Sequence, residues 1–151
     1  MGELTFGVPT LFGLESLCAD EMRRLGLEEV KAENGRVLCR GGLADLPRLN
    51  VNLRTGERVL LIMGTFPAEN FDALFEGTRA LPWEEWVPKD GRFWVTKASS
   101  IKSRLFSPSD IQRVMKKAMV ERMKQKYGLS LFPETGSSYP VRVFLYKDQV
   151  T

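Results

Sequence analysis

The residues of this sequence best suited to chemistry are lysines and arginines, which gather between positions 92 and 127. That segment holds ten cationic side chains and two acids, so it carries a charge of +8. The whole chain carries +3, which leaves −5 for everything outside the segment. A basic block on an otherwise acidic chain is typical of a surface that binds a polyanion, although a solvated helix face produces the same run of charges. The ten cations are Arg92, Lys97, Lys102, Arg104, Arg113, Lys116, Lys117, Arg122, Lys124 and Lys126.

The sequence contains few residues suited to nucleophilic catalysis or to metal binding. The chain has no histidine, which excludes Ser-His-Asp and Cys-His catalysis, and its two cysteines are too few for an ordinary structural zinc site. Cys18 and Cys39 are flanked by apolar residues and are expected to be reduced, buried thiols. The acids Glu84 and Glu85 have no neighbour that would visibly tune them for acid–base work. We therefore expect no catalytic residue, cofactor site or metal site in this chain.

Nine residues inside the basic block are candidates for contacts with phosphates or sugars. The first group lies in and after a strand predicted over residues 92–101, where cations and hydroxyls precede the free amides of a helix N-terminus. The second group projects from the polar side of that helix and would supply attraction that weakens with salt. A polar connector and a solubilising helix face are the structural alternatives. The candidates are Lys97, Ser99, Lys102, Ser103, Arg104, Arg113, Lys116, Lys117 and Lys124.

An amphipathic helix is predicted between Ser107 and Tyr127. Its apolar residues recur at i, i+3, i+4 and i+7 within an arc of roughly 180°. Ser107 can cap this helix, Pro108 suits its first position and Gly128 ends it. Arg122 falls inside the apolar arc, where it must either extend past the core or pair with a carboxylate. The apolar residues are Ile111, Val114, Met115, Ala118, Met119 and Met123.

Residues 1–66 predict the order strand, helix, strand, strand, helix, strand, which is the ferredoxin-like order. Such a unit has an antiparallel sheet with both helices on one face. The pair Asn34-Gly35 predicts a hairpin between the second and third strands, and the apolar run 58–66 predicts a strand buried on both faces. Glu21 falls in the apolar arc of the first helix, so it either needs a partner or lies at the edge of the arc. The six segments are 3–9, 14–25, 28–32, 35–40, 43–53 and 58–66.

A second unit is predicted from residue 67 onward, and a return strand is expected beyond Thr151. Trp83, Trp86 and Trp94 could stack on unpaired bases, although Trp83 and Trp86 are better placed to anchor a loop onto the core. Apart from the basic helix, the predicted elements are a helix at 70–80 and strands at 92–101, 129–132 and 139–147.

The order of these motifs resembles the N-terminal part of bacterial ribosomal-RNA methyltransferases that modify the exocyclic N2 of guanine in large-subunit RNA. The resemblance is carried by FGVPTLFGLESLCADEMRRLG, NGRVLCRG, LNVNLRTGERVLLIMGTF and LPWEEW. The later stretch VTKASSIKSRLFSPSDIQRVMKKAMVERMKQKYG is similar to their THUMP domain, an RNA-binding module. The resemblance implies an α+β chain with a ferredoxin-like βαββαβ domain at residues 1–66. A THUMP domain at residues 67–151, truncated before its last strand, would follow.

In that family a following Rossmann-like domain binds S-adenosylmethionine and transfers the methyl group. This chain has neither a strand–Gly-rich-loop–helix unit for a nucleoside cofactor nor an Asn/Asp-Pro-Pro-aromatic tetrad to clamp guanine. The resemblance therefore implies a module that docks structured ribosomal RNA for a methyltransferase domain absent from this chain. S-adenosylmethionine is expected only in that missing domain, and ribosomal RNA and that domain are the expected partners. A cytoplasmic location without membrane contact is expected, because no signal-peptide pattern or long apolar run is present.

Three other functions compete with this hypothesis. An RRM-like reader of single strands would carry aromatic residues on the third strand of the first unit, and GRVLCRG has none. A protein-interaction or assembly module could use the basic helix to dock an acidic protein partner. An enzyme is disfavoured by the missing nucleophile–base pairs.

Overall fold

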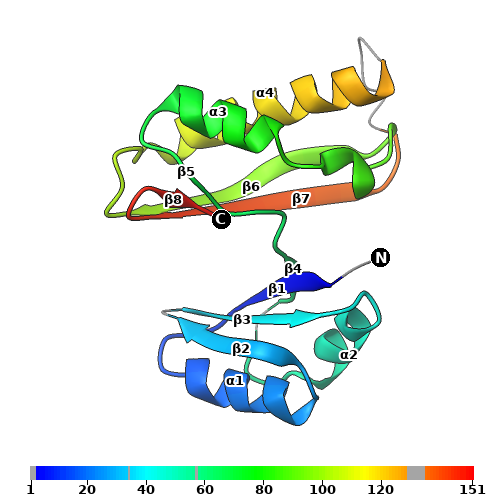
Figure 1. Ribbon diagram of the computed structural model, residues 1–151, viewed down its shortest axis with the longest axis vertical. Coiled ribbons are helices and arrows are strands. Elements are labelled where there is room, and N and C mark those ends of the chain that lie inside the picture. The colour runs from blue at the N-terminus through cyan, green and yellow to red at the C-terminus, as the bar shows by residue number, and fades with distance from the viewer. Residues whose placement is uncertain (1–2, 34, 57, 129–134) are drawn as a thin grey trace. The chain divides into compact units, whose positions relative to one another are not determined.

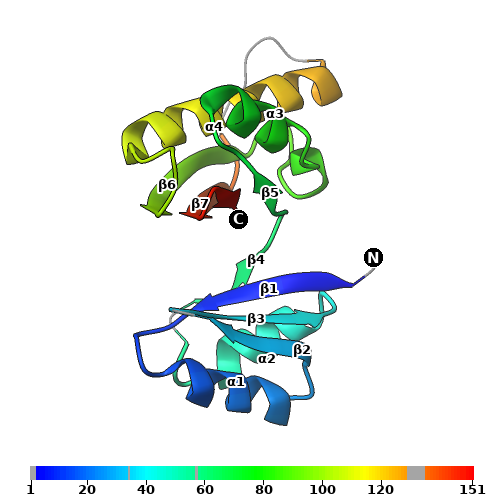
Figure 2. The same ribbon diagram turned by 60° about the vertical axis from the view of Figure 1, so that its left-hand side comes forward.

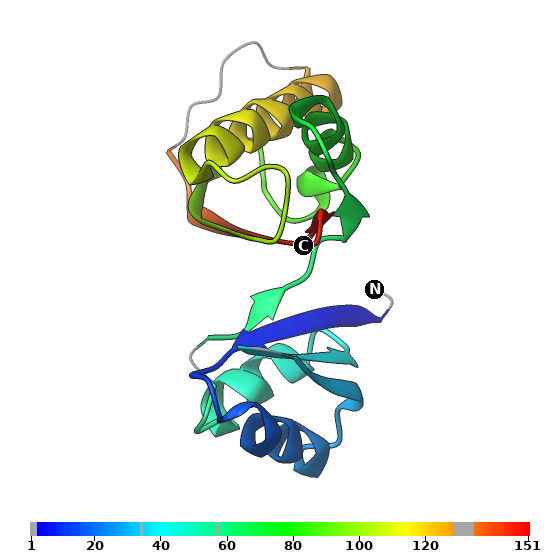
Figure 3. The same ribbon diagram turned by 90° about the vertical axis from the view of Figure 1, so that its left-hand side faces the viewer.

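The computed structural model describes residues 3–33, 35–56, 58–128 and 135–151. It divides into two compact units, Met1–Ile62 and Met63–Thr151 (Figure 1). Each unit is a four-stranded sheet with its helices on one face (Figures 2 and 3). None of the helices in the described part of the chain is both long and apolar enough to cross a membrane.

The first unit has the ferredoxin-like topology that its sequence predicts. Its sheet has the order β2-β3-β1-β4, and every pair is antiparallel. Helices α1 and α2 lie together on one face of this sheet (Figure 1). The elements are β1 (Leu4–Pro9), α1 (Glu15–Arg24), β2 (Glu28–Glu33), β3 (Arg36–Gly41), α2 (Asp45–Asn52) and β4 (Leu60–Leu61).

The buried groups of the first unit behave as their chemistry requires. Cys18 and Cys39 are free, buried thiols, and burial raises the pKa of Cys39 to about 11. The Glu21 carboxylate accepts hydrogen bonds from the Arg54 backbone N–H at 2.8 Å and the Thr55 hydroxyl at 3.0 Å. A partner for Glu21 is therefore present, in the loop that follows α2. The core around the two thiols also contains Phe6, Val8, Ala19, Met22, Leu27, Val37 and Leu49.

The second unit is built around one parallel strand pair. Its sheet has the order β5-β8-β7-β6, with β6 and β7 parallel and the other two pairs antiparallel. Because parallel neighbours need a long crossover, the connection from β6 to β7 includes helix α4. The elements are β5 (Phe66–Pro67), α3 (Phe71–Arg79), the 3-10 turn η1 (Trp83–Glu85), β6 (Arg92–Ile101), α4 (Pro108–Tyr127), β7 (Ser138–Tyr146) and β8 (Gln149–Val150).

Helix α4 packs its apolar face on this sheet, as predicted. Ser107 is its N-cap residue, although the Ser107 hydroxyl makes no capping hydrogen bond, and Pro108 opens the first turn. Gly128 ends the helix with φ 66°, a left-handed conformation that glycine adopts without steric cost. The buried residues of α4 are Ile111, Met115, Ala118, Met119 and Met123.

The prediction of a single strand over residues 58–66 is wrong. The run divides into β4, which pairs with β1 of the first sheet, and β5, which pairs with β8 of the second. Leu60, Leu61 and Phe66 are half-buried, because each sheet uses only a short piece of the run at its edge. An apolar run shows that a segment is buried, but it does not show that one sheet buries all of it.

The return strand also differs from its expected position. Lys147 and Asp148 have φ values of 49° and 64°, which form a tight hairpin turn directly after β7. Gln149 and Val150 then pair as β8 between β7 and β5, where a strand beyond Thr151 was expected. The strand predicted at residues 129–132 lies outside the described residues.

Candidate nucleic-acid interface

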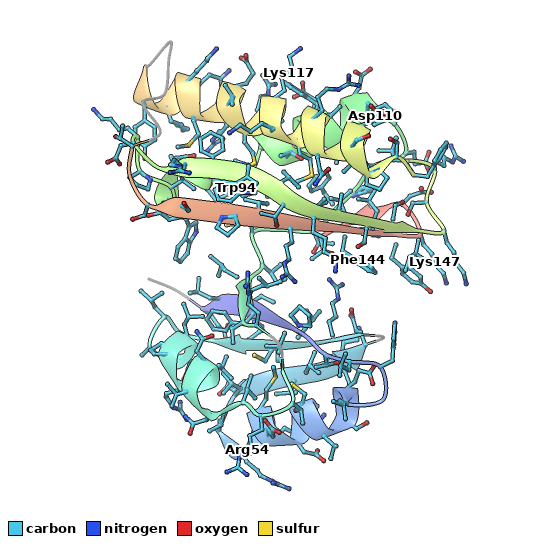
Figure 4. The ribbon with its side chains drawn as sticks, turned by 180° about the vertical axis from the view of Figure 1, so that it is seen from behind. Arg54, Trp94, Asp110, Lys117, Phe144 and Lys147 are labelled. Carbon is cyan, nitrogen blue, oxygen red and sulfur yellow. The ribbon has the colours of Figure 1, made fainter. Side chains whose placement is uncertain are left out.

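The outer side of α4 carries a narrow stripe of cations. Arg113, Lys117 and Lys124 fall within an arc of about 40° when the helix turns 100° per residue. Lys117 projects from α4 on the side away from the sheet (Figure 4). The Arg113 guanidinium donates to the Asp110 carboxylate at 2.9 Å, and the Arg113 side chain remains largely exposed. Among the described residues, no carboxylate lies within ion-pair distance of Lys117 or Lys124.

Lys116 does not share this stripe, so its predicted position on the exposed face is wrong. Its Nζ donates to the Phe93 carbonyl and lies 3.9 Å from the centroid of the Phe93 ring. Gln112, one turn earlier, donates through Nε2 to the Val95 carbonyl at 3.0 Å. Because β6 is the last strand of the sheet in the part of the chain that the structure describes, these two side chains supply donors that a further strand would otherwise provide. Lys116 therefore covers a sheet edge.

The loop between β6 and α4 is tied to the turn after β7. The Asp148 carboxylate accepts from the Arg104 backbone N–H at 2.7 Å, and the Asp148 backbone N–H donates to the Ser103 hydroxyl at 3.1 Å. Arg104 also pairs with Glu69 at 3.1 Å in an exposed position. Lys102 is exposed, and no carboxylate among the described residues lies within ion-pair distance of it. Of the three loop candidates, Lys102 has its charge free for a ligand.

Lys97 and Ser99 lie on the face of the sheet that the helices do not cover. An irregularity between Val95 and Lys97 shifts the alternation of β6, so Lys97 pairs in register with Arg142 and Ser99 with Phe144. The nine candidates are thus divided among the outer stripe of α4, the connecting loop and the opposite face of the sheet. They do not form one continuous surface, because an α4 that covers one sheet face cannot share a side with residues on the other.

Of the two arrangements predicted for Arg122, the structure shows the pair with a carboxylate. Its guanidinium donates to both carboxylate oxygens of Glu84, at 2.9 and 2.6 Å. These hydrogen bonds lower the pKa of Glu84 below its ordinary value. The Tyr127 hydroxyl also contacts the carbonyls of Glu84 and Val87, at 3.1 and 2.9 Å. Arg122 and Tyr127 therefore fasten the η1 segment to α4.

The three tryptophans have different environments. Trp83 is 3% exposed and donates through Nε1 to the Thr78 carbonyl at 2.8 Å, so it anchors η1 to α3 and cannot stack on a base. Trp86 is half-buried. Trp94, on β6, is 40% exposed. Only Trp94 of the three has the open ring surface that stacking requires.

Arg142, Phe144 and Tyr146 belong to the sheet face of Lys97 and are not among the nine candidates predicted from the sequence. They lie on β7, outside the segment in which cations are dense. The signal that could have found them is the alternation of SYPVRVFLY, in which these three residues share one face of the strand.

The hollow in the described part of the first unit is not suited to an anion. A hollow of about 440 Å³ is lined by Glu3, Glu28, Arg40 and Asp45, together with three glycines. Arg40 already pairs with Glu3 and Glu29, each at 2.6 Å, so its charge is neutralised. Among the described residues there is also no group of three His, Cys, Asp or Glu side chains that could hold a metal ion.

Both units match known domain families. Residues 5–60 match the RlmL ferredoxin-like domain, and residues 68–151 match the THUMP domain. A Bacillus subtilis (strain 168) protein named "Putative RNA methyltransferase YpsC" is 41% identical over 139 residues, which are 91% of this chain and 36% of that protein. A Pseudomonas aeruginosa protein named "Ribosomal RNA large subunit methyltransferase K/L" is 32% identical over 141 residues, which are 91% of this chain and 19% of that protein.

A solved structure agrees with these matches. The structure of a "possible methylase" from Clostridium difficile 630 is 39% identical in sequence and superposes with a TM-score of 0.95. The alignment covers 99% of this chain and 40% of that one. The chain therefore spans well under half the length of these three relatives.

Proposed function

Because this chain belongs to the THUMP domain family and carries an RlmL-type ferredoxin-like domain before it, we propose that it is the RNA-binding portion of a longer methyltransferase. It holds structured ribosomal RNA in the cytoplasm. A following domain, which binds S-adenosylmethionine, transfers the methyl group to the exocyclic N2 of a guanine. The observation that carries this proposal is the THUMP match over residues 68–151.

The outer stripe of α4 supplies the attraction in this proposal. Lys117 and Lys124 present charges without a carboxylate partner among the described residues, and they are suited to the phosphates of a stem. Arg113 and Arg104 are held in exposed ion pairs worth about 0–1 kcal/mol, so an RNA phosphate can replace Asp110 or Glu69. The stripe binds the RNA backbone, because its cations contact the charged phosphates and do not reach the edges of the bases.

Charge reversal on this stripe tests the proposal. We expect Lys117→Glu with Lys124→Glu to weaken binding of a hairpin from large-subunit ribosomal RNA roughly tenfold at low salt. The dependence of log K on log salt should become shallower by about two, because two phosphate contacts are lost. Fluorescence anisotropy of a labelled hairpin at several salt concentrations measures both quantities.

The matched control changes the net charge by the same amount in the first unit. Arg24→Glu with Lys31→Glu alters two exposed cations there and should change the affinity less than about twofold, because neither cation belongs to the stripe. Equal weakening by the two double variants would contradict the proposal. Competition with heparin distinguishes RNA binding from docking of an acidic protein. If RNA is the ligand, heparin should compete more weakly than the unlabelled hairpin.

A further inference from the structure

The second sheet has an open face, formed by the outward side chains of β6 and β7. The inward residues of the two strands, including Phe93, Val95, Val143 and Leu145, are buried in the core under α3 and α4. Alternation along each strand places the remaining side chains on the opposite face. The open face consists of Arg92, Trp94, Lys97, Ser99 and Ile101 from β6 and Pro140, Arg142, Phe144 and Tyr146 from β7.

The cations of the open face have no carboxylate beside them among the described residues. Neither β6 nor β7 contains an Asp or Glu. Among the described residues, no carboxylate lies within ion-pair distance of Arg92, Lys97 or Arg142. Lys147, just past the end of β7, places its Nζ 5.3 Å from the centroid of the Tyr146 ring. The charge of this face is therefore available to an anionic ligand.

Aromatic rings flank the cations on this face. Trp94 and Tyr146 are each 40% exposed. The Phe144 ring lies 6.4 Å from the Tyr146 ring at an interplanar angle of 14°, so the two rings are nearly parallel. Phe144 and Lys147 lie on the side of the sheet away from α4 (Figure 4).

The strand register sets the order of these groups across the face. Trp94 pairs with Pro140, and the next outward pair is Lys97 with Arg142, followed by Ser99 with Phe144. Phe144 lies four positions after Pro140 on β7, a distance of about 13 Å at the rise of a strand. The order along the sheet is therefore ring, cation pair, ring, with room for more than one nucleotide.

We propose that the open face binds unpaired nucleotides of the RNA. Bases stack on Trp94 and Tyr146, and Lys97 and Arg142 contact the phosphates between them. This inference rests on the proposed function, because it assumes that the chain binds RNA. It adds a second ligand class, since the stripe on α4 binds the backbone of stems and the open face binds single strands.

Substitution of Trp94 tests the inference with two probes. We expect Trp94→Ala in the 151-residue chain to weaken binding of a short single-stranded oligoadenylate about tenfold or more, the range of one lost stacking contact. Binding of a blunt RNA duplex should change less than about twofold, because a paired base has no free face to stack. Trp94→Phe should retain most of the affinity for oligoadenylate. Phe12→Ala is the matched control, since Phe12 is 83% exposed on the first unit.

Arg142→Ala provides a second variant in case Trp94→Ala does not fold. It should make the salt dependence of oligoadenylate binding shallower by about 0.7, the value for one phosphate of a single strand. Equal effects of Trp94→Ala on both probes, or no effect on either, would overturn the inference while leaving the proposed function intact. If the unchanged chain binds neither probe, both proposals fail. A Trp94→Ala chain that loses self-association in sedimentation would assign the face to a second copy and also overturn it.

Discussion

The two outer faces of the second unit, the stripe on α4 and the open face of β6 and β7, are both basic but differ in what surrounds the charge. On the stripe, Arg113 has Asp110 beside it and Glu121 follows on the same helix. On the open face no acid is present in either strand. The difference shows that a count of cations along a segment does not locate the free charge, because carboxylates on neighbouring turns or loops can neutralise it.

The two faces also differ in aromatic content. The stripe consists of long flexible cations, which attract phosphates irrespective of base sequence. The open face adds the rings of Trp94 and Tyr146, which can stack on bases that are not paired. We therefore expect the two faces to respond oppositely to the secondary structure of the RNA.

Charge reversal on the open face should have the largest effect, and it tests whether the two faces differ in binding single-stranded RNA. We expect Lys97→Glu with Arg142→Glu to reduce the affinity for single-stranded oligoadenylate roughly 100-fold, because two phosphate contacts become repulsions. Lys117→Glu with Lys124→Glu should reduce it less than about threefold, because the stripe lies on the other side of the sheet. Anisotropy titrations of both double variants measure the ratio. Similar losses in the two variants would abolish the distinction between the faces.

A smaller effect separates cations that stabilise the fold from cations that bind. Arg122→Ala should lower the free energy of unfolding by about 2–3 kcal/mol, because the carboxylate of Glu84 is left half-buried without its bidentate partner. Urea denaturation followed by circular dichroism measures this loss. The affinity for oligoadenylate, measured below the unfolding transition, should not change, and a parallel loss of affinity would place Arg122 at the RNA interface.

The same ion pair makes a testable contribution to the pH dependence of stability. Since Arg122 lowers the pKa of Glu84, the stabilisation is complete above the ordinary carboxyl pKa near 4.5 and is lost as the pH falls through the lowered value. The unchanged chain should therefore lose more stability on acidification than Glu84→Gln. Parallel pH profiles of the two proteins would show that the pair contributes nothing at neutral pH.

The smallest expected effect concerns Lys116. Lys116→Ala should cost about 1 kcal/mol of stability, because the Phe93 carbonyl at the edge of β6 loses a charged donor. Arg113→Ala is the matched control on the same helix and should stay within about 0.5 kcal/mol, since its ion pair is exposed. Thermal unfolding of the two variants measures the difference. If Lys116→Ala instead weakens hairpin binding as much as Lys117→Glu with Lys124→Glu, Lys116 belongs with the stripe.

Several features followed from the sequence because they express local rules. The spacing of Ile111, Met115 and Met119 specifies a helix face regardless of its surroundings, and Gly128 ends that helix because it accepts a left-handed conformation. A partner was one of the two arrangements expected for Glu21 and for Arg122 from the same local pattern, since a charged group on an apolar face must either be compensated or reach past its edge. Which residues compensate them was not predictable, because Thr55 and Glu84 are distant in the chain.

The nine candidate residues lie in three separate places, and not on one surface, for a related reason. Lys97, Lys116 and Lys117 are near one another in the sequence, yet they lie on the open face, at a sheet edge and on the stripe. The irregularity between Val95 and Lys97 sets which side of the strand Lys97 occupies, and the packing of α4 turns Lys116 toward Phe93. The side of the strand that Lys97 occupies and the direction of Lys116 both depend on contacts between secondary-structure elements.

By itself, the sequence determined the element types, the ferredoxin-like order of the first unit and the excess of positive charge, because periodicity, turn residues and composition are properties of neighbours along the chain. Only the tertiary structure decided where that charge is free. Pairing of β6 with β7 brought Arg142 and Phe144 beside Lys97, and docking of α4 against β6 removed Lys116 from the exposed set. The reason is physical: a binding surface is defined by side chains adjacent in space, and sheet register and helix packing create that adjacency.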